Sequence, residues 1–97
     1  MKLKILGYHF KVKAMTREKA DELDGHYDDF TKTIEIDTKL HPETIQATLL
    51  HEAIHVISDH MHLGLSERQV RGLEVGISSF LRDNGVRLTN LYVRNKS

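Results

Sequence analysis

The sequence predicts an α+β fold in which a small antiparallel sheet packs against two helices. Two patterns support this prediction. Apolar and polar residues alternate through much of the first 37 positions, with the period of half-buried strands. From His41 onward, apolar residues recur at the 3.6-residue spacing of an amphipathic helix. Since 97 residues are enough for one small core only, we expect a single domain over residues 1–97.

The expected strands lie in the first third of the chain. Apolar residues at 3 and 5, and then at 10, 12 and 14, predict two strands, with residues 7–9 as the hairpin turn. Residues 16–23 are charged and fit either a loop or a short helix, and Gly25 is a turn signal. Residues 27–30 and 33–37 then predict two further short strands.

Two helices are expected after this sheet. Pro42 suits the first turn of a helix, and Glu43 suits its positive end. Gly64 interrupts that helix, and Ser66 with Gln69 forms a capping-box pattern that starts the next one, which Asn84 and Gly85 end. Residues 86–93 fit a last strand or a tail equally well. The expected apolar stripes are Ile45, Leu49, Leu50, Ala53, Ile54, Ile57 and Met61 in the first helix, and Val70, Leu73, Ile77, Phe80 and Leu81 in the second.

Composition narrows the classes of function. Fourteen acidic and fourteen basic side chains cancel, and no basic stretch is long enough to suggest a phosphate-backbone footprint, so we expect no nucleic-acid partner. Neither a signal segment nor a membrane-spanning stretch is apparent, which favours a cytoplasmic protein without a membrane partner. Because cysteine is absent, a metal site here must use His, Asp or Glu.

His51, Glu52 and His55 spell the motif HExxH within the first expected helix. Two His four residues apart point the same way from a helix, so both imidazoles can reach one Zn²⁺. Glu52 points to the side and can act as general base toward a zinc-activated water. On a helical wheel, His51 and His55 lie opposite the apolar stripe. The motif therefore predicts a zinc metallopeptidase, that is, a hydrolase of peptide bonds.

The third zinc ligand stays open between two glutamates of the second helix. If the two helices form a tight antiparallel hairpin, Glu74 is level with the gap between His51 and His55. If the hairpin is splayed, or the first helix ends early, Glu67 fits instead. His60 and His62 are weaker alternatives, because both are typical of polar residues at a fraying helix end.

The chain also resembles a known family. The segments K-I-L-G-Y at 4–8, I-E-I-D at 34–37, T-L-L-H-E-A-I-H at 48–55, L-S-E-R-Q-V at 65–70 and L-R-D-N at 81–84 are similar to small phage and mobile-element proteins of the ImmA/IrrE metallopeptidase type. The resemblance implies a zincin-like fold of the gluzincin kind and places Glu67 ahead of Glu74 as third ligand. The family usually has a small residue where this chain has Glu74.

These expectations define an enzyme with a protein or peptide substrate. Residues 33–37 are the expected edge strand beside the cleft, where an extended peptide can pair. Tyr8, Tyr27 and His62 are candidate donors to the tetrahedral oxyanion. Two other classes compete with this reading: a zinc-stapled protein-interaction module without catalytic activity, and a metal-free interaction protein with an incidental HExxH.

Overall fold

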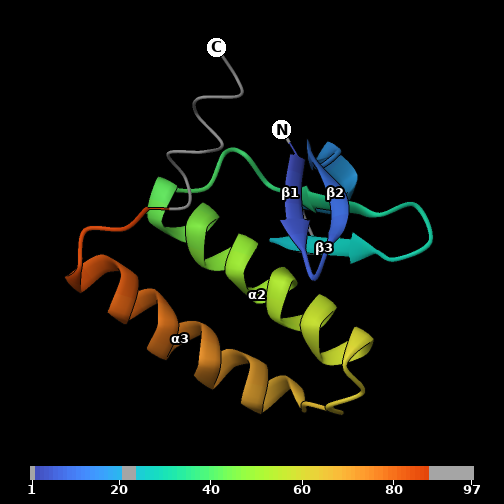
Figure 1. Cartoon of the computed structure of the whole chain (residues 1–97). Coiled ribbons are helices and arrows are strands. Elements are labelled where there is room, and N and C mark those ends of the chain that lie inside the picture. The colour runs from blue at the N-terminus through green and yellow to red at the C-terminus, as the bar shows by residue number, and fades with distance from the viewer. Residues whose placement is uncertain (1, 21–23, 88–97) are drawn as a thin grey trace.

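The computed structural model describes residues 2–20 and 24–87, which form a four-stranded mixed sheet followed by two helices packed together (Figure 1). The strands are β1 (Lys2–Ile5), β2 (Tyr8–Ala14), β3 (Gly25–Asp28) and β4 (Thr33–Ile36). Their order across the sheet is β1-β2-β4-β3. The short helix α1 (Arg17–Ala20) lies in the connection between β2 and β3.

The expectation of an antiparallel sheet was wrong for one pair of strands. β1 with β2 and β3 with β4 are antiparallel, but β2 and β4 run parallel, with Val12 beside Ile34. β4 therefore lies inside the sheet and β3 forms its edge. Alternation of apolar and polar residues predicts strands and their buried faces, but it does not specify which strand pairs with which.

Two turns also differ from their expected positions. Leu6 and Gly7 form the first hairpin turn, with φ angles of 51° and 84°, so Tyr8 and His9 belong to β2. A positive φ at the second turn position suits glycine. In the second hairpin, β3 already ends at Asp28, whose carboxylate accepts a hydrogen bond from the backbone N–H of Phe30 at 2.8 Å. Phe30 therefore lies in the turn and is 97% exposed.

The long helices are α2 (Pro42–His60) and α3 (Glu67–Asp83), and Pro42 and Glu43 lie in the first turn of α2 as expected. His41 caps α2 through its Nδ1 atom, which accepts from the N–H of Glu43 at 3.2 Å. The capping box of Ser66 and Gln69 is present in both directions, and Asn84 ends α3. Residues 88–93, the greater part of the segment left open between a strand and a tail, lie outside the described residues.

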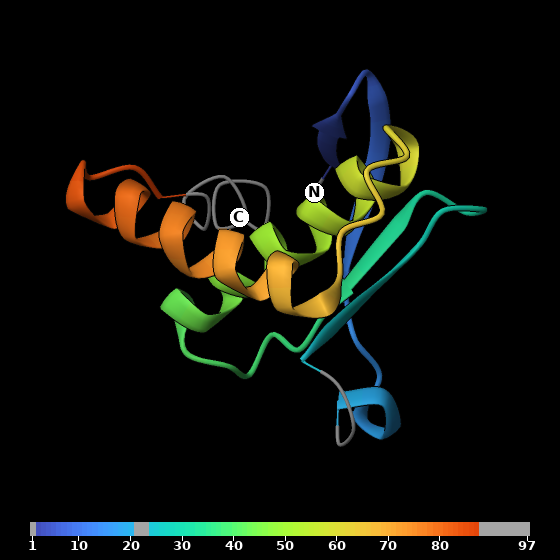
Figure 2. The same cartoon turned by 90° about the horizontal axis from the view of Figure 1, so that it is seen from below.

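The molecule has three layers, the sheet, α2 and α3, because α2 covers one face of the sheet and α3 packs on α2 (Figures 1 and 2). This corrects the expectation that both helices pack against the sheet. In α3 only Val70 is fully buried, while Leu73, Ile77 and Phe80 are 43%, 36% and 64% exposed. The core lies between sheet and α2 and consists of Ile5, Phe10, Val12, Ile34, Ile36, Ile45, Leu49 and Val56.

In the described part of the chain, neither α2 nor α3 is long and apolar enough to cross a membrane.

Candidate metal centre

α2 holds His51 and His55 one turn apart on its side facing α3. Their ring centroids are 4.8 Å apart, and their Nε2 atoms are separated by 3.2 Å. Both side chains are half-buried. Thr48, one turn before His51 on this side of the helix, is only 8% exposed. This side of α2 is therefore covered, as is the side that packs on the sheet, because α2 is the middle layer.

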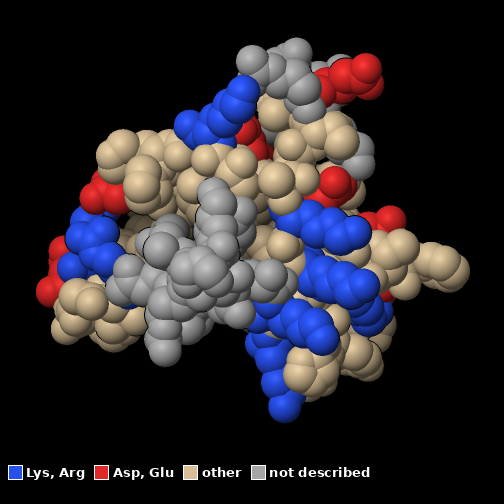
Figure 3. All heavy atoms as spheres, turned by 90° about the horizontal axis from the view of Figure 1, so that it is seen from above, with Lys and Arg blue, Asp and Glu red and all other residues tan. Residues whose placement is uncertain are grey.

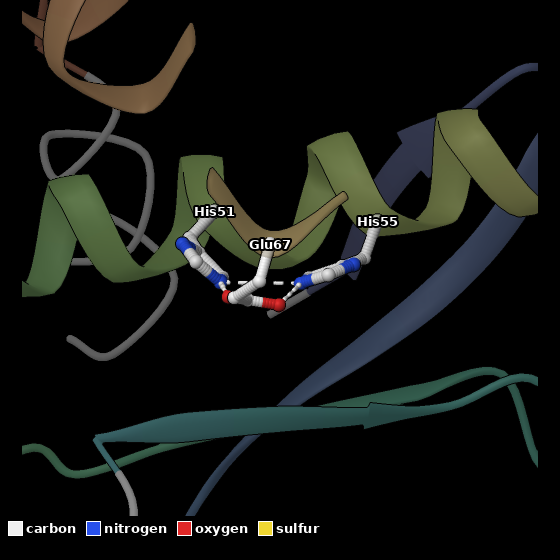
Figure 4. Close-up of side chains that lie close together, drawn as sticks. All are labelled: His51, His55 and Glu67. Carbon is white, nitrogen blue, oxygen red and sulfur yellow. Dashed lines mark hydrogen bonds and ion pairs between the residues drawn. The ribbon is translucent and has the colours of Figure 1, made fainter. Parts of the chain in front are cut away.

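Glu67 completes a group of three possible metal ligands (Figure 4). Its Oε1 lies 2.7 Å from Nε2 of His51, and its Oε2 lies 3.1 Å from Nε2 of His55. The capping box explains its position, because Ser66 starts α3 and makes Glu67 the first helical residue. One atom from each of the three residues falls within 4.8 Å of the others, so His51, His55 and Glu67 can hold a metal ion.

The three donor atoms are spaced so that one metal ion could lie between them. Two ligand atoms bound to zinc at ~2.0–2.1 Å in tetrahedral geometry lie about 3.3 Å from each other. The 3.2 Å between the two Nε2 atoms is close to this value, whereas Oε1 of Glu67 lies nearer to Nε2 of His51, at 2.7 Å. Two imidazoles and one carboxylate are also ligands that zinc accepts in catalytic sites, where water or substrate takes the fourth position.

Glu74 contacts the other side of the His51 ring. Its Oε1 lies 2.7 Å from Nδ1 of His51 and accepts a hydrogen bond from that nitrogen. A proton held on Nδ1 leaves the lone pair of Nε2 free toward Glu67 and His55. Carboxylate–imidazole contacts of this kind fix the tautomer and orientation of metal-binding His. Glu74 thus lies beside His51, and Glu67 lies within the three-residue group.

The remaining His candidates do not join this group. Nε2 of His60 lies 2.6 Å from Oδ1 of Asp29, at the far end of α2, where its ring also stacks against Tyr8 at 4.8 Å. His62 follows the helix in the exposed turn, with a φ of 54°. Both side chains thus lie at the C-terminal end of α2, away from His51 and His55.

Glu52 is the most buried carboxylate beside the candidate metal-binding group of His51, His55 and Glu67, with 8% of its surface exposed. Burial raises the pKa of its carboxyl above the ordinary value, although the neighbouring His51 and His55 act in the opposite direction. It lines the same cleft as both histidines. A carboxyl in this position can accept a proton more readily than an ordinary surface Glu, because its charged form is poorly solvated.

The cleft has a volume of about 740 Å³ and lies between β3, α2 and α3. Gly25 allows the edge strand to approach α2 closely. A Cβ atom at this position would lie 2.5 Å from Cγ2 of Thr48 and 3.2 Å from the backbone oxygen of Glu35. Gly25 was expected to mark a turn, but it begins β3, and the reason for glycine here is the absence of space.

Of the three candidate oxyanion donors, only Tyr27 lines the cleft, and its hydroxyl already donates to Asp59. Sequence reasoning missed two other residues of the cleft. His26 lies on β3 and its Nε2 is 2.8 Å from Oε1 of Glu35. Arg71 lies one turn after Glu67, 4.0 Å from its carboxylate. The four-residue spacing of Glu67 and Arg71 could have predicted their contact, because residues four apart lie on the same helix face. Nothing in the sequence indicates that His26 lies near the HExxH motif.

No family model, curated protein or solved structure matches the chain.

Proposed function

We propose that this protein is a zinc-dependent metallopeptidase of the zincin type, with His51, His55 and Glu67 as ligands and Glu52 as general base. The observation that supports this most directly is the position of Glu52. It is buried in the cleft beside two histidines that converge on a third ligand, and its pKa is raised. A site that only stores or structurally binds a metal has no need of such a base.

Zinc, when bound, supplies a Lewis acid that polarises a carbonyl and acidifies water. The chain's own residues supply the remaining functions. Glu52 takes a proton from the attacking water and passes it to the leaving amine. Glu74 holds His51 in one orientation through Nδ1. The positions of Glu67 and Glu74 relative to the histidines also agree with the gluzincin arrangement that the resemblance implies.

The substrate class we propose is an extended peptide. β3 is the edge strand beside the cleft and lines it with residues 25–27, so its outer edge offers backbone groups to a peptide strand. We expected residues 33–37 to be the edge strand that pairs with a peptide. Because β4 lies between β2 and β3, we assign this role to β3 instead.

One observation favours the competing function of a zinc-stapled interaction module. Val70 is the only fully buried residue of α3, and Glu67 and Glu74 of α3 both contact His51 of α2. A metal bound by both helices would stabilise their contact even without catalysis. Both proposals therefore need the same ligands, and they differ only in the need for Glu52.

Glu52→Gln separates the two. The enzyme proposal expects unchanged zinc content and fold, and cleavage of denatured protein or peptide libraries reduced by about two orders of magnitude or more. Glu43→Gln, an exposed carboxyl at the start of the same helix, is the matched control. Equal cleavage by wild type and Glu52→Gln would reject the general base, and the stapled module would then explain the zinc site.

A further inference from the structure

Four lysines lie on the outer face of β1 and β2, the face that points away from α2. Lys2, Lys4, Lys11 and Lys13 are all exposed, and they alternate with the core residues of their strands. Side chains at alternate strand positions share a face, so these four lie opposite to the α2 side of the sheet. Figure 3 shows Lys and Arg side chains lying side by side over this part of the molecule.

Sheet pairing brings the lysines of separate strands together. Lys2 is directly opposite Lys11, and Lys4 is opposite His9, whose side chain is also exposed. Like charges directly opposite each other destabilise a strand pair. No Asp or Glu precedes Glu18 in the sequence, so β1 and β2 themselves offer no compensating charge. The nearest strand residue that does is Glu35 of β4, beside Lys13, and His26 already lies 2.8 Å from it.

Protection of a sheet edge does not explain the whole array. Lysines on an exposed edge strand prevent pairing with another chain, which accounts for Lys2 and Lys4 on β1. β2 is an interior strand, paired with β1 on one side and β4 on the other. Edge protection therefore does not explain Lys11 and Lys13, which lie beside the lysines of β1.

We propose that this basic face, formed by Lys2, Lys4, Lys11 and Lys13, binds the phosphate backbone of a nucleic acid. Successive lysines on one strand are about 6.6 Å apart and the two strands about 4.8 Å apart, which forms a regular array of positive charge. The large exposed apolar residues of the described chain lie at the turns, on α3 and after the helices, apart from Tyr8 at the start of β2, which alternates with the residues of the lysine face. Interfaces with nucleic acid are polar and positively charged, whereas protein interfaces have an apolar centre and membrane contacts need apolar insertion.

The inference departs from the expectation of no nucleic-acid partner. That expectation rested on the absence of a continuous basic stretch, but in a strand, alternation is the pattern that places charges on one face. No Phe, Tyr or Trp lies on the outer face of β1 and β2 as a stacking platform, since Tyr8 and Phe10 alternate with its residues. Recognition is therefore of phosphates and independent of base sequence. The metal-binding group lies beyond α2, so the two sites do not compete.

The test measures fluorescence anisotropy of a labelled DNA duplex and a single strand of the same length, titrated with the full chain between about 50 and about 200 mM salt. We expect binding of at least one form, with affinity falling linearly on a logarithmic salt scale. The double variant Lys11→Gln with Lys13→Gln should weaken binding about tenfold or more and reduce the salt slope by about two. Lys39→Gln with Arg68→Gln, which removes the same charge from exposed positions elsewhere, is the control.

Three results would overturn the proposal. These are absence of binding to both nucleic acids at the lowest salt, an equal loss of affinity in the control variant, or tighter binding to phosphatidylserine vesicles or polyglutamate than to either nucleic acid. Circular dichroism of the two double variants establishes that both are folded. A higher affinity for the duplex or for the single strand then identifies which form of nucleic acid the basic face binds.

Discussion

His51 lies between two carboxylates of α3, with Oε1 of Glu74 2.7 Å from its Nδ1 and Oε1 of Glu67 2.7 Å from its Nε2. The two glutamates are seven residues apart, or about two helical turns, so one face of α3 presents both to the same ring. The two glutamates that the sequence left open as third ligand therefore lie on opposite sides of the His51 ring. Glu67 belongs to the candidate metal-binding group, and Glu74 contacts the ring from behind.

The two glutamates should differ in their effect on zinc affinity. Glu67→Gln removes the proposed third ligand and should weaken zinc binding by more than Glu74→Gln, for which we expect a loss of about 10- to 100-fold, as for other partners of metal-binding histidines. Competition with a chromogenic chelator measures both. Glu43→Gln should bind zinc like the wild type. A larger loss in Glu74→Gln than in Glu67→Gln would reverse the assignment.

Zinc should stabilise the fold through the same ligands. A ligand that binds only the folded state adds about 2.7 kcal/mol at a free concentration of 100 times its Kd. We therefore expect the Tm of the wild type to rise on adding zinc and to fall on adding a chelator. His51→Ala with His55→Ala should show neither change, while His9→Ala, exposed on β2, should retain both. A zinc-dependent Tm that survives in the double variant would contradict the proposed site.

Gly25→Ala should destabilise the protein because the new Cβ would lie 2.5 Å from Cγ2 of Thr48. Overpacking of this kind typically costs about 1–3 kcal/mol. Thr48→Ser removes the clashing methyl group, so the two substitutions should show favourable coupling in a double-mutant cycle measured by urea unfolding. Additive effects of the two substitutions would mean that the clash with Thr48 is not the cause.

Gly72→Ala provides the comparison within the same chain. Gly72 lies inside α3, and its added Cβ would meet nothing within 4 Å. Because alanine favours a helix interior over glycine by about 1 kcal/mol, this substitution should raise the free energy of unfolding. Opposite signs at the two glycines would show that local space decides the outcome at Gly25.

The sequence predicts best where the signals are local. The capping box of Ser66 and Gln69 involves residues three apart, and it correctly locates the start of α3. The spacing of His51 and His55 likewise indicates two rings on one helix face. Such features depend on helix geometry alone, which the residues within one or two turns largely determine.

What the sequence did not predict depends on contacts between distant segments. The parallel pairing of β2 with β4 joins residues about twenty positions apart, and alternation carries no information about that partner. Val56 was missed as a core residue although it lies seven positions after Leu49 and packs with it in the core between the sheet and α2. The roles of Glu67 and Glu74 depended on the approach of the two helices, which neither helix specifies by itself.

The last prediction concerns the contact between the β3–β4 turn and the end of α2, where Asp29 meets His60 at 2.6 Å. The hydrogen bond from His60, together with that from Lys32, lowers the pKa of the Asp29 carboxyl below its ordinary value. A depressed carboxyl pKa stabilises the folded state above the unfolded-state pKa of about 3.9, and this stabilisation is lost as the pH falls through the folded-state value. Asp29→Asn should therefore lower the Tm at neutral pH, and the difference from wild type should shrink as the solution is acidified below about pH 4. His60→Gln, which removes the largest cause of the shift, should reduce the same difference. Thermal unfolding of both variants and the wild type across this range measures it, and a difference that grows on acidification would contradict the assigned direction.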